Sequence, residues 1–107
     1  MSFIFHTKIV GSTFCGGQNL IPELDRGDPL QLVRDPENEF DTNAVQVRNE
    51  NGDLLGHLPK DTAAEVAPLM DGGTEVKAKV AEITGGSGNH YGCNVTLSYY
   101  PPETAHG

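Results

Sequence analysis

Apolar and polar residues alternate over several short stretches of the chain, and Gly, Asn and Pro separate these stretches. A period of two places every second side chain on one face, which is typical of strands in a small antiparallel β fold. The pattern predicts strands over residues 6–10, 30–34, 44–48, 54–58, 75–83 and 93–100. We expect the first two strands to be joined by a polar loop that contains Gly16, Gly17 and Pro22.

The connections carry recognisable turn signals. The segment Asn49–Asp53 contains Asn51-Gly52, which predicts a hairpin with antiparallel strands on either side. Asp35-Pro36 begins a second turn, because a residue before proline is displaced from the helical region. The glycine-rich stretch Gly85–Asn89 is expected to be a mobile hairpin loop between the last two strands.

One helix is predicted, and it opens at Pro59-Lys60-Asp61 with Asp61 as the N-cap. Apolar residues at helical spacing follow, and Asp71-Gly72-Gly73 ends the pattern. Because Pro68 lies inside it, we expect the helix to be short or kinked there. Five or six short strands and one helix most naturally close into a small barrel.

Length and composition fit one folded domain over residues 1–107. Hydrophobic residues make up 36% of the chain, and 13 glycines bring the apolar class to the ordinary level for a modest core. We expect the folded part of the domain to span about residues 7–100, with a flexible tail at 101–107. No apolar run approaches a membrane helix and the N-terminus lacks a signal-peptide layout, so we expect a soluble, cytoplasmic protein without a membrane partner.

The charge balance is acidic, with 15 acidic against 7 basic residues and a formal net charge of −8. Nucleic-acid-binding domains usually carry a basic field that releases counterions on binding. Any contact with a nucleic acid must therefore be local.

Catalytic and metal sites are not indicated. The stretch Gly85–Gly88 lacks the Lys-Ser/Thr of a phosphate-binding loop and lies between two strands. The four histidines show no ligand spacing, and Cys15 and Cys93 form no Cys-x-x-Cys pair, so we expect reduced thiols and no metal. Cys15 fits a small buried thiol better than a nucleophile. We therefore expect no enzyme activity and no cofactor.

The most informative segment runs from Arg34 to Val47. In it a strand enters a polar turn, presents Phe40 beside Asp41, and resumes as a strand at Ala44. An aromatic ring at a turn exit can stack on a nucleic-acid base, and an adjacent carboxylate can accept hydrogen bonds from sugar hydroxyls. Alternatively, Phe40 plugs the end of the barrel and Asp41 caps the turn. Taken alone, the residues leave both interpretations open and favour the second.

Four motifs in this order and spacing resemble the HIRAN domain: Val10-Gly11-Ser12-Thr13-Phe14, Leu32-Val33-Arg34-Asp35-Pro36, Asn38-Glu39-Phe40-Asp41-Thr42-Asn43-Ala44-Val45 and Leu55-Gly56-His57-Leu58-Pro59. The resemblance covers about residues 7–100. It implies a mainly β fold, an OB-like small β-barrel of five to six strands with one or two short helices. It also implies binding of single-stranded DNA and, in fork-remodelling helicase-like ATPases, capture of a free 3′ end. Small bacterial members without an ATPase match this length.

The resemblance further implies which residues bind DNA. The two rings that sandwich the terminal base fall on Phe14 and Phe40, the carboxylate that contacts the 3′-hydroxyl falls on Asp41, and a neighbouring polar contact falls on Asn38.

Phosphate contacts fall on His57 and on Lys60 at the start of the predicted helix. Thr13 stands where DNA-binding members carry a phosphate-binding arginine. Asn43 and Gly56 are expected to be structural, with Asn43 holding the turn and Gly56 permitting close passage of the backbone.

The sequence therefore predicts a binding module for the 3′ end of single-stranded DNA, in DNA repair or replication-fork processing. A protein-interaction domain that uses its acidic surface for a partner is the alternative from another class. A third hypothesis is a subunit that supplies end recognition to a helicase or nuclease partner. The sequence gives no oligomeric state.

Overall fold

The computed structural model describes residues 3–12, 16–86 and 89–100. Within these ranges, six strands form one antiparallel sheet in the order β1-β6-β5-β2-β3-β4. The helical segments are α1 (Gly17–Leu20), the short 3-10 helix η2 (Ile21–Glu23) and α2 (Lys60–Asp71). The strands are β1 (Phe3–Lys8), β2 (Pro29–Arg34), β3 (Val45–Arg48), β4 (Leu54–His57), β5 (Val76–Gly86) and β6 (Asn89–Tyr99).

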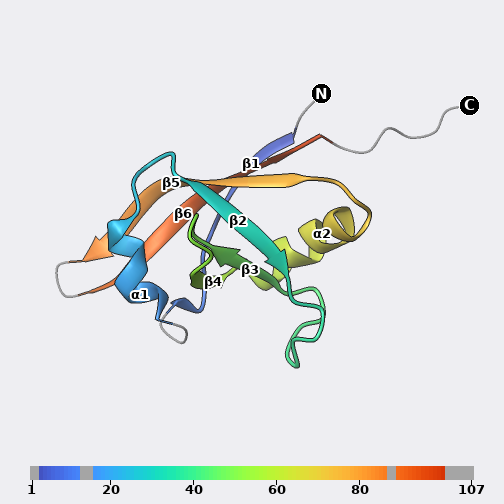
Figure 1. Ribbon diagram of the computed structural model, residues 1–107, viewed down its shortest axis with the longest axis horizontal. Helices are drawn as coiled ribbons and strands as arrows, with labels where there is room; N and C mark the ends of the chain where they lie inside the picture. The colour runs from blue at the N-terminus through green and yellow to red at the C-terminus, as the bar shows by residue number, and fades with distance from the viewer. Residues whose placement is uncertain (1–2, 13–15, 87–88, 101–107) are drawn as a thin grey trace, which may run out of the picture.

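The sheet turns at β2, which crosses from the long β5–β6 hairpin to the short β3–β4 hairpin (Figure 1). Only its first two residues pair with β5, whereas residues from Gln31 to Arg34 pair with β3. At the far edge, an isolated bridge joins His57 of β4 to Val10, two residues after β1. Each of the two donates its backbone N–H to the other's carbonyl at 2.8 Å. The sheet therefore curls back on itself, and the expected mainly β, OB-like fold is confirmed.

The core follows from the alternation of side chains. In β3, Val45 and Val47 are fully buried while Gln46 and Arg48 are half-buried. Helix α2 covers the same core with the apolar face predicted from its spacing. The other fully buried large side chains are Ile21, Leu55, Val66, Val80, Cys93, Val95 and Leu97.

Two details of the helices differ from the sequence-based expectations. The expected polar loop between the first two strands contains α1 and η2, and Ile21 in η2 is fully buried. The prediction of Asp61 as N-cap is wrong, because Pro59 occupies that position and Asp61 lies in the first turn. The Asp61 carboxylate instead accepts a hydrogen bond from the N–H of Thr62 at 2.9 Å.

Helix α2 also continues through Pro68 to Asp71. Proline has no N–H to donate to the carbonyl four residues earlier, which belongs to Ala64. Ala64 is exposed, so water can satisfy that carbonyl and the helix tolerates the proline.

The last hairpin is longer than its alternation suggested. Strands β5 and β6 extend until Gly86 pairs with Asn89, and Gly85 has a positive φ of 84°. Part of the expected hairpin loop, Cys15 and the expected tail at 101–107 lie outside the described residues.

Neither a bilayer-spanning helix nor a metal-binding cluster occurs in the described ranges. No helix there has the length and apolar character needed to cross a bilayer. No three His, Cys, Asp or Glu side chains gather there as a group that could hold a metal ion.

Candidate nucleic-acid interface

A surface groove of about 600 Å³ lies where the loop after β2 faces the end of β4 and the start of α2. Its lining includes Val10 and Gly11 from the segment after β1. It also brings together five of the residues that the family resemblance implied, Asn38, Phe40, Asp41, His57 and Lys60. The other two, Thr13 and Phe14, lie outside the described residues.

The Phe40 side chain is 84% exposed. An aromatic ring that plugged the barrel would be largely removed from solvent, so this part of the alternative interpretation is wrong. An aromatic ring that lines a groove and stays exposed can stack on a nucleic-acid base. Phe40 therefore offers a face on which a base or another planar group can stack.

Asn38 shapes the loop that carries this ring. Its side-chain oxygen accepts hydrogen bonds from the backbone N–H groups of Phe40 at 2.9 Å and Asp41 at 3.1 Å. Its amide nitrogen donates to the carboxylate of Asp35 at 3.2 Å. Such local bonds are the usual way in which Asn stabilises a turn. Asn38 thus holds the turn by its side chain, the role expected of Asn43.

The Asp41 carboxylate is half-buried in the groove and caps the same turn. Its Oδ1 atom accepts the backbone N–H of Asn43 at 2.9 Å, so Asn43 takes part through its backbone. The turn-capping interpretation of Asp41 is therefore correct. This hydrogen bond uses one carboxylate oxygen, and the other can accept a hydroxyl hydrogen from a ligand.

Arg34 fixes the far end of this loop and was not identified as a site residue from sequence. Its guanidinium donates to the carbonyls of Ala44 at 2.7 Å and Thr42 at 3.0 Å. It also binds the carboxylate of Asp71 through two hydrogen bonds, at 2.9 and 3.2 Å. Arg34 thereby connects the loop to the C-terminal end of α2.

The opposite wall depends on Gly56. A Cβ atom at this position would lie 2.5 Å from both Cγ2 of Ile9 and the carbonyl oxygen of Val10. Real Cβ atoms do not approach other atoms so closely, so only glycine lets β4 pass the segment after β1. The expectation that Gly56 permits close backbone passage is confirmed. It allows the bridge that fixes His57 beside the groove.

The cations on this wall are few. His57 is half-buried, and Lys60 is exposed in the first turn of α2. The N-terminal end of a helix adds a partial positive charge that favours anions, but Asp61 in the same turn offsets it. Across the groove the loop contributes the carboxylate of Asp41, and the exposed Glu37 and Glu39 in the same loop do not line the groove. The groove can therefore make only a small number of favourable phosphate contacts.

Gln18 of α1 links Ser12 to Tyr91 of β6 through its side-chain amide. Its amide nitrogen donates to Oγ of Ser12 at 2.6 Å and to the carbonyl of Tyr91 at 2.8 Å. Its amide oxygen accepts the N–H of Tyr91 at 2.7 Å. The buried Gly17 packs against β4, since a Cβ there would collide with the Leu55 carbonyl. The ends of the segment that includes Thr13 and Phe14 are thus held against β4 and β6.

Solved structures with the same fold include a protein from Lactobacillus plantarum, which matches with a TM-score of 0.75 and 20% sequence identity, covering 94% of this chain and 98% of that chain. The crystal structure of the HIRAN domain of human HLTF matches with a TM-score of 0.76 and 27% sequence identity, covering 94% of this chain and 77% of that chain. The NMR structure of the same domain in its DNA-bound conformation matches with a TM-score of 0.64 and 28% identity, covering 95% and 76%.

Curated relatives are much longer proteins. The helicase-like transcription factor of Homo sapiens is 32% identical over 84 residues, which is 75% of this chain and 8% of that protein. The Fanconi-associated nuclease 1 homolog of Arabidopsis thaliana is 40% identical over 65 residues, which is 61% and 7%. The chain therefore spans less than a tenth of the length of these relatives.

The family model described as HIRAN domain matches residues 2–100, nearly the whole sequence. Its match agrees with the fold and with the motifs around the groove. This chain belongs to the HIRAN domain family.

Proposed function

We propose that this protein is a DNA-binding module that holds the free 3′ end of single-stranded DNA in the groove described above. The observation that carries the proposal is the exposed Phe40 ring next to the half-buried Asp41 carboxylate, with Lys60 and His57 across the groove. A HIRAN domain solved in a DNA-bound conformation supports DNA as the ligand.

In the proposed complex the terminal base stacks on Phe40, with Phe14 as the second ring. Stacking of one base on an aromatic side chain contributes about 1–3 kcal/mol and works with every base, so we expect weak sequence preference. Asp41 accepts a hydrogen bond from the 3′-hydroxyl through the oxygen that does not cap the turn. A charge-assisted bond of this kind is worth about 1.5–3 kcal/mol.

Phosphates are contacted by Lys60, by His57 and, at most weakly, by the neutral Thr13. One to two such contacts correspond to a shallow salt slope of about −0.7 to −1.4, because each phosphate contact to a single strand contributes about −0.7. Affinity therefore depends mainly on the terminal nucleotide. A blunt duplex should bind less well than a frayed end, since a paired base must first be freed before it can stack.

The test compares oligonucleotides that end in a 3′-hydroxyl or a 3′-phosphate, by fluorescence anisotropy. Asp41→Ala should weaken binding of the hydroxyl end by roughly tenfold or more and leave the phosphate end little changed. Glu39→Ala is the matched control, because it removes an exposed carboxylate two residues away that does not line the groove. Equal weakening of both ends by Asp41→Ala would mean that the carboxylate acts by capping the turn, or that the hydroxyl contact is wrongly assigned.

The formal charge of −8 supports one alternative, a protein-interaction domain of the same fold. The two functions differ at low ionic strength, where single-stranded DNA binding is strongest. Absence of binding there at high protein concentration, by a folded sample, would favour the alternative.

The longer relatives suggest the setting. Their names include a helicase-like protein and a nuclease, so the module would supply end recognition to a helicase or nuclease partner in DNA repair or replication-fork processing. We expect the protein alone to leave a bound oligonucleotide intact.

A further inference from the structure

The outer face of the β1-β6-β5 part of the sheet carries a cluster of basic side chains. Side chains of residues directly opposite each other in neighbouring strands share a face. The cross-strand pairs therefore form three rows on this face: Ile4, Ser98 and Lys77; His6, Thr96 and Lys79; Lys8, Asn94 and Glu82. We call these rows the basic face.

The basic face contrasts with the acidic remainder of the chain. The sequence has four lysines. Lys60 lines the groove proposed to hold the 3′ end, and the other three, Lys8, Lys77 and Lys79, are exposed on the basic face. Its carboxylates are Glu82, beside Asn94, and Glu75, 3.9 Å from the ammonium of Lys77. That pair is mostly exposed and therefore weak, so the lysine can also contact a ligand.

The basic face is continuous with the groove at the start of α2. The hydroxyl of Thr62 lies 3.1 Å from that of Thr7, whose side chain alternates with those of His6 and Lys8, so the first turn of α2 packs against the other face of β1, at the edge of the sheet. A shallow depression between α2 and the basic face is lined by His6 and Lys8 and also by the carboxylates Asp61 and Glu82. A strand that leaves the groove at Lys60 therefore reaches the basic face across one helix turn.

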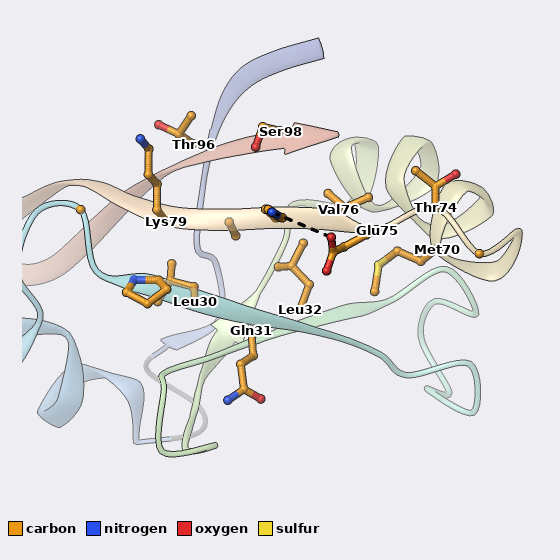
Figure 2. A pocket seen from close by; sticks show the side chains of 15 residues that line it. Leu30, Gln31, Leu32, Met70, Thr74, Glu75, Val76, Lys79, Thr96 and Ser98 are labelled. Carbon is orange, nitrogen blue, oxygen red and sulfur yellow. Dashed lines mark ion pairs between the residues drawn. The ribbon is translucent and has the colours of Figure 1, made fainter. Parts of the chain in front are cut away.

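A second groove, of about 750 Å³, opens on this face where β2 leaves β5 after Leu30 (Figure 2). Lys77, Lys79, Thr96 and Ser98 lie along it, and Figure 2 shows Lys79 and Thr96 pointing to the same side of the sheet. Its lining also includes Glu75 and the apolar, half-buried Leu32, Met70 and Val76. Cations and hydroxyls beside apolar side chains match the phosphates, sugars and bases of a polynucleotide.

We infer that the basic face binds the phosphate backbone of the same nucleic-acid strand whose 3′ end occupies the first groove. The inference rests on the proposed function and adds a second contact region to it. Its physical basis is charge complementarity in a chain that is otherwise acidic, together with the continuous path past Lys60. An acidic polypeptide would match the charge of the basic face. It would not need the apolar side chains of the second groove or the path to the groove at Phe40 and Asp41.

The experiment compares two strands with the same 3′ end, about four and about twelve nucleotides long, titrated at several salt concentrations. The longer strand should bind the parent protein more tightly and with a steeper salt slope. Lys77→Gln combined with Lys79→Gln should lower that slope by about 1.4 and weaken the longer strand by roughly 5-fold per lysine at 0.1 M salt, because 0.1 to the power −0.7 is about 5. The short strand should bind the variant as it binds the parent.

Two further variants control for folding and for charge. Lys77→Arg with Lys79→Arg keeps both cations at the same positions and should retain the length dependence. Glu82→Gln removes the carboxylate in the row of Lys8 and should tighten the longer strand selectively. All variants change exposed side chains, so their unfolding midpoints should equal that of the parent.

The outcomes separate the two proposals. If the parent binds both strands equally, or if the glutamine variant weakens both equally, the basic face is not a backbone site and the end-binding proposal stands. If neither strand binds the parent, both proposals are wrong. If poly-glutamate displaces the longer strand more effectively than oligothymidylate of equal length, the face belongs to an acidic polypeptide instead.

Discussion

Replacing Arg34 by methionine removes the guanidinium that ties the Phe40 loop to α2, and keeps an unbranched apolar stem. The carbonyl of Ala44 keeps a second hydrogen bond, from the N–H of Asp35 at 2.9 Å, and Thr42 is exposed to water. No buried acceptor is therefore left unsatisfied, and the loss is that of the bonds themselves. Two bonds at about 1–1.5 kcal/mol each give a decrease of about 2–3 kcal/mol in the free energy of unfolding.

The ion pair with Asp71 adds less. The Arg34 side chain is 16% exposed and that of Asp71 is 59% exposed, and pairs with an exposed partner contribute about 0–1 kcal/mol. Asp71→Asn should therefore cost below about 1 kcal/mol. Arg34→Lys should behave like Arg34→Met, because an ammonium cannot span two carbonyls and a carboxylate as the planar guanidinium does.

Urea denaturation measures the stability of the three variants, and anisotropy with a free 3′ end measures the consequence for the loop. We expect Arg34→Met and Arg34→Lys to weaken end binding and Asp71→Asn to preserve it. A lysine variant as stable as the parent would refute the argument, since charge alone would then suffice. So would an Asp71→Asn variant as unstable as Arg34→Met, because the ion pair would then dominate.

Three further predictions concern other positions. Phe40→Ala should change the free energy of unfolding by less than about 0.5 kcal/mol, because Phe40 is 84% exposed, and should weaken single-stranded DNA binding by about 1–3 kcal/mol. Phe40→Tyr keeps the ring and should retain binding. Normal affinity of the alanine variant would exclude stacking on this ring. Gly56→Ala should lower the free energy of unfolding by about 1–3 kcal/mol or more in a thermal melt, because the added Cβ collides with the Val10 carbonyl; an unchanged melting temperature would contradict the close packing. Burial raises the pKa of the Cys93 thiol from 9.0 to about 11, so the unfolded chain loses this proton first and stability should fall as pH rises from 9 to 11. Cys93→Ala should show a smaller fall over that interval in urea titrations, and identical pH profiles would argue against the shift.

Local signals in the sequence were sufficient for much of the sheet. The Asn51-Gly52 turn and the alternation on either side of it define β3 and β4, because hairpin pairing needs only short-range information. The N-cap of α2 was misassigned by two residues, since Asp61 is a good N-cap type but Pro59 already has the extended backbone that precedes a helix. The burial of Ile21 was not predicted, because the three-residue helix η2 that carries it is too short to show a periodic pattern.

Contacts between distant residues could not be predicted in this way. Arg34 lies on a strand with an ordinary alternating pattern, and Asp71 follows 37 positions later. Asn38 and Asp41 were associated with each other through the family motif, and both line the groove. Their hydrogen bonds within the turn depend on loop geometry that residue types alone do not specify. The exposed orientation of Phe40 likewise contradicted the plug that residue types favoured.

The isolated bridge between Val10 and His57 has a consequence for dynamics. Because it pairs a strand end with a connecting segment, the two can separate without breaking the β3–β4 or β1–β6 ladders. An isolated bridge of this kind opens locally at a lower free energy than the core does, and its amide hydrogens exchange with solvent sooner. Val10 and His57 also line the groove at Phe40 and Asp41, so a ligand bound there contacts both sides of the bridge and stabilises its closed form. Binding of a ligand in the groove should therefore slow deuterium uptake at the backbone amides of Val10 and His57. Hydrogen exchange at the point where the barrel closes would then report on binding.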